Sequence, residues 1–122
     1  MSEQKFLFDT YAILEIIDGN PLYEKYTDSE IIINDFIFAE LCYKLIREKA
    51  PNRDSYLKRH APFIVYADSE VLKEAMQFRV DNLKKNLSMT DCISYCLANR
   101  LGIKFLTGDK EFESMSNVEF VK

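Results

Sequence analysis

Short apolar runs alternate along the chain with segments in which apolar residues recur every three or four positions. The runs 5–8, 30–33, 103–106 and 118–120 have strand character, and 63–66 is a weaker candidate. The segments between them have the periodicity of helices that bury one face. Strands that alternate with helices favour a parallel sheet. We therefore expect an α/β fold with a central parallel sheet of four to five strands, flanked by helices on both faces.

Capping residues and helix breakers place the expected helices. In chain order these helices cover 11–18, 21–26, 35–49, 52–60, 69–83, 89–101 and 110–115. Thr10 is the expected cap of the first helix, and Ser88 and Asp91 have the spacing of a capping box. Gly102 should end the helix that Ser88 begins, and Met89 should lie on the buried face of that helix.

Composition is that of an ordinary globular protein: 122 residues are 48% hydrophobic and 30% charged, so we expect one domain spanning 1–122. No apolar stretch reaches the length of a membrane span, and no secretory signal opens the chain, which predicts a cytoplasmic location without membrane partners. Cys92 and Cys96 are spaced like a zinc pair. We interpret them as buried apolar residues, because His60 is distant and no second cysteine pair exists.

The net charge of −4 disfavours a nucleic-acid partner weakly, but its distribution is uneven. Residues 1–40 carry nine acids and two bases, whereas 41–60 carry two acids and six bases. A local basic surface can bind phosphates even on an acidic domain. The alternative is a solvated helix face.

Four acids are candidates for one site. Asp9 and Asp109 follow expected strands, and Asp91 opens the helix that leads back to the start of the second of these strands. Glu40 lies early in the helix after another strand. Because ligands bind beyond the carboxyl ends of parallel strands, all four acids should meet at that edge.

Carboxylates gathered in one place repel each other, and a divalent cation with a preference for oxygen ligands removes this cost. The pattern therefore predicts metal-dependent phosphoryl chemistry. Each acid also has a simpler interpretation: Asp9, Asp91 and Asp109 as helix caps, and Glu40 as the ion-pair partner of Lys44.

The order of these motifs resembles the PIN-domain nucleases, and among them the small VapC-like toxins, over nearly the whole chain. The first strand ends in Asp9-Thr10, Glu40 lies in Phe-Ala-Glu-Leu, and Asp91 follows Ser-Met-Thr. The last motif, Thr-x-Asp-x-x-Phe, runs from Thr107 to Phe112. Asn34 and Glu111 depart from the family pattern without touching the four acids.

This resemblance implies an endoribonuclease dependent on Mg²⁺ or Mn²⁺. Asp9, Asp91 and Asp109 would be metal ligands, and Glu40 a ligand or a water-orienting residue. Thr10 and Thr107 would donate hydrogen bonds that fix the carboxylates. The resemblance further implies an RNA substrate, an antitoxin partner and a homodimer.

Basic and aromatic residues near the acids are candidates for contacts with RNA. The candidate phosphate contacts are Lys44, Lys84, Lys85 and Lys110, although for Lys84 and Lys85 we favour the alternative of a solvated helix end. Tyr11, Tyr43 and Tyr95 are candidates for stacking on unpaired bases, with packing as the alternative for each.

Two other functions compete with the nuclease. The first is a phosphatase of the haloacid-dehalogenase kind with Asp9 as nucleophile, which is disfavoured because that chemistry needs a second acid where Tyr11 stands. The second is a non-catalytic binding module that keeps the PIN fold, in which the acids serve as caps and surface charges.

Overall fold

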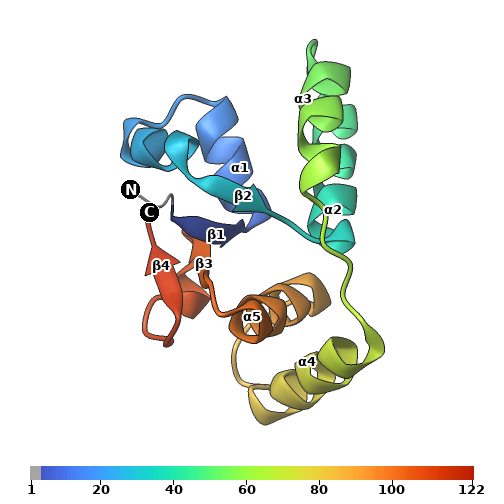
Figure 1. Ribbon diagram of the computed structural model, residues 1–122, viewed down its shortest axis with the longest axis vertical. Helices are drawn as coiled ribbons and strands as arrows, with labels where there is room; N and C mark the ends of the chain where they lie inside the picture. Colours follow the sequence, from blue (N-terminus) through green and yellow to red (C-terminus); the bar gives the residue numbers. More distant parts are fainter. Residues whose placement is uncertain (1–3) are drawn as a thin grey trace.

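A parallel sheet of four strands lies at the centre of the computed structural model, which describes residues 4–122 (Figure 1). The strand order is β2-β1-β3-β4, and each neighbouring pair is parallel. The strands are β1 (Lys5–Phe8), β2 (Glu30–Ile32), β3 (Lys104–Thr107) and β4 (Val118–Phe120). The predicted α/β architecture is thus confirmed, with four strands.

Helices cover both faces of this sheet, with α1 on one side and α5 on the other (Figure 1). Outside them, η1 packs on α1, α4 packs on α5, and α2 pairs with α3 beside the sheet. Their bounds are α1 (Thr10–Ile17), η1 (Pro21–Asp28), α2 (Asp35–Arg47), α3 (Arg53–His60), η2 (Ala61–Phe63), α4 (Ser69–Asp81), α5 (Met89–Leu101) and η3 (Lys110–Phe112). None of these helices has the length and hydropathy needed to cross a membrane.

The core lies where the two central strands meet the helices. Leu7 and Phe8 of β1 and Phe105 and Leu106 of β3 are completely buried. These strands read as continuous apolar runs because both of their faces are covered. Helix α5 is buried over seven consecutive residues, 92–98, because it lies between the sheet and α4. The cysteines at 92 and 96 belong to this buried stretch, as expected.

Three local expectations were wrong. The segment 63–66 is no strand: Phe63 belongs to η2, and only Ile64 forms a bridge, to Ile33. Met89 is 49% exposed, because the first turn of α5 extends beyond the sheet. Thr10 is the first residue of α1 and Asp9 is its cap.

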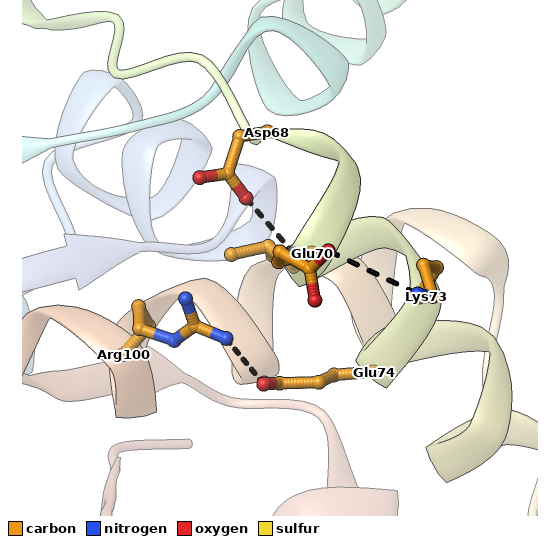
Figure 2. Close-up of polar contacts among 6 residues, drawn as sticks. Asp68, Glu70, Lys73, Glu74 and Arg100 are labelled. Carbon is orange, nitrogen blue, oxygen red and sulfur yellow. Dashed lines mark hydrogen bonds and ion pairs between the residues drawn. The ribbon is translucent and has the colours of Figure 1, made fainter.

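Polar contacts fix the start of α4 and its packing on α5 (Figure 2). Asp68 caps α4, because its Oδ1 accepts from the Val71 amide at 3.0 Å. Arg100 of α5 forms an ion pair with Glu74 of α4. Both partners are partly exposed, so this pair contributes at most about 1 kcal/mol. Asp68 is therefore a carboxylate helix cap that is not one of the four candidate acids.

Candidate active site

The four predicted acids line one cleft at the carboxyl edge of the sheet. The cleft has a volume of about 470 Å³. Asp9, Asp91 and Asp109 come from the start of α1, α5 and η3, and Glu40 comes from the second turn of α2. The remaining lining residues are Thr10, Tyr11, Lys44, Gly108, Lys110 and Lys122. Chain direction therefore predicted the convergence of the acids correctly.

Asp9 lies deepest and is only 6% exposed. Its Oδ1 accepts from the Thr10 amide at 2.8 Å, and its Oδ2 accepts from the Thr107 hydroxyl at 2.7 Å. Burial, together with the negative charges of Asp91 and Glu40, raises the pKa of Asp9 to about 7, against the lowering effect of the Thr107 hydrogen bond. The folded protein thus disfavours the ionised form of Asp9.

Asp91 takes part in the predicted capping box. Its Oδ2 accepts from the Ser88 amide at 2.9 Å, while its own amide donates to the Ser88 hydroxyl at 3.0 Å. Burial raises the pKa of Asp91, and the charges of Asp109 and Glu40 add to that increase against the Ser88 hydrogen bonds. Burial is thus the main cause of both raised pKa values, and repulsion from neighbouring acids adds to each of them.

Two threonine hydroxyls connect the acids to one another. Thr107 donates to Asp9, and its oxygen accepts from the Asp109 amide at 3.1 Å. Thr10 donates to Glu40 Oε1 at 2.8 Å. Within residues 4–122, Glu40 makes no ion pair with Lys44 inside 4.0 Å, so the simple pairing considered for Glu40 is absent there.

The capping interpretation of the three aspartates is correct as well. Asp9 caps α1, Asp91 completes the box of α5, and Asp109 Oδ1 caps η3 by accepting from the Glu111 amide at 3.0 Å. Caps and cleft coincide because each of these elements starts at the carboxyl edge. The partial positive charge of a helix start also favours a carboxylate there.

Asn34, which departs from the family pattern, is a structural residue of the site that the sequence analysis did not identify. It is completely buried, its Oδ1 accepts from the Ile37 amide at 2.8 Å, and its Nδ2 donates to the Ser94 hydroxyl at 3.0 Å. One side chain thus caps α2 and ties it to α5, which fixes the helix of Glu40 against that of Asp91. A capping Asn is visible in a sequence, whereas its distant partner is not.

The candidate basic residues separate into two groups. Lys44 and Lys110 line the cleft as expected. Lys84 and Lys85 lie outside it, between α4 and α5, where the Lys85 ammonium donates to the Glu111 carbonyl at 3.3 Å. Lys122 also lines the cleft and was missed. The sequence feature that could have identified Lys122 is the strand before it: β4 is parallel to β3, so the residues after both strands lie at the same edge of the sheet as Asp109.

The three candidate tyrosines also differ. Tyr95 is wrong as a base-stacking residue, because it is buried, stacks on Phe78 and donates to the Ser116 carbonyl at 2.7 Å. Tyr11 lines the cleft beside Gly108, where any Cβ would lie 2.3 Å from the tyrosine ring. Tyr43 is 61% exposed on α2.

A sequence model of the PIN domain matches residues 6–118. The chain belongs to the PIN domain family. No curated protein matches its sequence.

Solved structures with the same fold include several toxins. VapC20 of Mycobacterium tuberculosis, a sarcin-ricin loop cleaving toxin, is 15% identical with a TM-score of 0.76 over 98% of this chain and 100% of that one. A toxin-antitoxin complex from Klebsiella pneumoniae is 14% identical, with a TM-score of 0.75 over 93% of this chain and 95% of that one. The DNA-bound VapBC of Salmonella typhimurium is 21% identical, with a TM-score of 0.69 over 97% of each chain. At these identities the likeness shows the PIN fold alone.

PIN nucleases generally use divalent metal ions, and the donor chemistry of this PIN domain fits one. The four acids offer only oxygen ligands, and their repulsion would be relieved by a hard cation. With the side chains as they stand, no three histidine, cysteine or acidic residues within 4–122 are grouped closely enough to hold an ion. Coordination of one ion by three of these acids would require some of their side chains to rotate.

Proposed function

We propose that this PIN domain is an endoribonuclease that depends on Mg²⁺ or Mn²⁺ and hydrolyses RNA phosphodiester bonds as the toxin of a toxin-antitoxin pair. The observation that carries this proposal is the single cleft in which four acids from four separate segments meet. Lys44 and Lys110 at the same cleft supply positive charge for the phosphates of RNA. The PIN family membership adds a general expectation of nuclease activity.

Each residue has a part in the proposed reaction. A bound cation would acidify a water and neutralise charge on the phosphate oxygens. Asp9, Asp91 and Asp109 would hold that cation, and Glu40 would bind it or orient the attacking water. Thr10 and Thr107 keep two carboxylates in place through hydrogen bonds at 2.8 and 2.7 Å. Such supporting contacts affect metal affinity by about 10- to 100-fold.

The proposed setting includes an antitoxin and a second copy of the chain. Structures of the same fold come from a Klebsiella toxin-antitoxin complex and from VapBC bound to DNA, which supports an antitoxin as partner. The homodimer, the single domain over 1–122 and the cytoplasmic location are proposals that follow from the family resemblance and the composition.

Cleavage of a panel of structured RNAs, including transfer RNAs, tests the proposal. Wild type should cut at least one RNA with Mn²⁺ and stop with a chelator. Asp91→Asn and Asp109→Asn should lose cutting by more than 100-fold while remaining folded, because Asn retains the capping oxygen. Asp68→Asn is the matched control, since it changes a carboxylate cap outside the cleft. Cutting that persists in the cleft variants would refute the assigned roles.

A non-catalytic PIN-fold binding module is the second candidate. Two observations favour it. The three aspartates already serve as helix caps. Within residues 4–122, no three acidic, histidine or cysteine side chains lie close enough together to hold an ion. Titration with Mn²⁺ separates the two functions. The nuclease requires a metal-dependent rise in melting temperature that Asp91→Asn abolishes, whereas the module requires none.

A further inference from the structure

An exposed polar face of α2 leads out of the acidic cleft. Glu40 and Lys44 line the cleft, and Tyr43 and Arg47 follow at helical spacings that place all four on one face. That face is distinct from the side that buries Leu41. From Glu40 to Arg47 it is about 10 Å long, given a rise of about 1.5 Å per residue.

Tyr43 and Arg47 form an exposed cation–π pair on this face, outside the cleft. The Arg47 guanidinium lies 5.3 Å from the centre of the Tyr43 ring, and Tyr43 is 61% exposed. Folding thus leaves a large aromatic ring in water with a cation over it. An aromatic ring and a guanidinium are the groups on which unpaired bases stack.

The charge on this face is available to an anionic partner. Among residues 4–122, neither Lys44 nor Arg47 forms an ion pair with a carboxylate inside 4.0 Å. The surrounding segment 41–60 carries six bases and two acids in a chain of net charge −4. A face that begins inside the cleft and carries two unpaired cations beside an exposed aromatic ring suits a nucleic-acid strand better than a protein partner.

We propose that Tyr43, Lys44 and Arg47 bind the single-stranded RNA that flanks the cleavage position. Lys44 contacts a phosphate at the cleft, and the Tyr43–Arg47 pair stacks on an unpaired base farther along the strand. The length of about 10 Å corresponds to at most about three nucleotides at the stacked spacing of about 3.4 Å, and to fewer in an extended strand. This inference rests on the proposed RNA substrate and narrows it to RNA that is unpaired beside the cut.

Fluorescence anisotropy with a short fluorescein-labelled RNA, in EDTA so that nothing is cut, measures this contact. Tyr43→Leu should weaken binding of the single strand roughly tenfold, within the range for one lost base stack. Arg47→Gln should weaken it severalfold, because the guanidinium is part of the pair on which the base stacks. Tyr66→Leu and Lys73→Gln are the controls, because Tyr66 is also a largely exposed tyrosine and Lys73 is an exposed base on α4.

The same strand annealed to its complement gives the second comparison. Tyr43→Leu should leave binding of the duplex within about twofold, because stacked and paired bases offer no free face. Equal losses in Tyr43→Leu and Tyr66→Leu, or wild-type binding by both α2 variants, would overturn the inference and leave this face to a protein partner.

Cleavage assays separate this inference from the proposed function. If wild type cuts RNA but the α2 variants bind it normally, only the α2 contact is refuted. If wild type binds through Tyr43 and Arg47 but cuts nothing with Mn²⁺, only the nuclease is refuted. When both hold, Tyr43→Leu should raise KM and leave kcat nearly unchanged, as expected for a residue that binds substrate away from the reacting atoms.

Discussion

Asp9→Asn should stabilise the metal-free protein at neutral and higher pH. Asp9 has a pKa of about 7 in the folded chain against an ordinary value of 3.8, because it is buried among other acids. The folded chain therefore holds this proton more tightly than the unfolded chain. Stability then falls as pH rises from about 4 to about 7, and the loss is complete above that range. Asparagine carries no charge and avoids the loss.

The size of the effect follows from the same pKa. At about 1.4 kcal/mol per pKa unit, ionised Asp9 costs the folded state about 4 kcal/mol above neutral pH. Asparagine keeps an oxygen that accepts from the Thr10 amide. Its Nδ2 can donate to the Thr107 hydroxyl oxygen. That oxygen already accepts from the Asp109 amide and has a second lone pair. Weaker hydrogen bonds offset about 1 kcal/mol, which leaves a gain of about 3 kcal/mol.

Thermal unfolding in EDTA between about pH 5 and about pH 8 measures this gain. A difference of about 3 kcal/mol corresponds to roughly 10 °C in Tm for a chain of this length. Asp9→Asn should melt higher than wild type at the upper pH, and the advantage should shrink as the pH falls. Asp68→Asn, which changes a cap outside the cleft, should show no such trend. A wild-type advantage at the upper pH would refute the claim that the acids of the cleft repel one another.

Three further outcomes follow from the cleft. Mn²⁺ affinity should rise with pH up to about pH 7, because the ion competes with the Asp9 proton. Calorimetry in buffers of different ionisation enthalpy should detect the released proton. Thr107→Val should weaken Mn²⁺ binding about 10-fold or more by removing a supporting hydrogen bond, whereas Thr107→Ser should restore it. Gly108→Ala should lower the free energy of unfolding by about 1–3 kcal/mol in denaturant titrations, because its Cβ would lie 2.5 Å from the Val121 carbonyl oxygen.

Chain direction and capping signals were enough to predict where the acids meet. Asp9 and Asp109 follow parallel strands, and Ser88 with Asp91 marks the start of a helix at the same edge, so neither placement depends on tertiary detail. The strand at 118–120 was also predicted, and its direction places Lys122 at the cleft, but Lys122 was not among the predicted site residues.

Contacts between residues distant in the chain could not be predicted from the sequence. Tyr95 is one helical turn from Asp91, but its ring packs on Phe78, because the helix lies between the sheet and α4. The failed strand at 63–66 has the same origin: its apolar residues pack against the core without a partner strand to pair with, apart from one bridge at Ile64.

The double duty of the three aspartates bears on how such a protein would evolve. Folding alone selects for a side-chain oxygen at the starts of α1, α5 and η3, whether or not the cleft performs any chemistry. A lineage that had lost catalysis would drift there toward asparagine, with a gain in stability at Asp9. Glu40 begins no helix, so nothing in the capping of the fold would preserve it. In related genomes, retention of that glutamate is accordingly the more telling mark of a working enzyme.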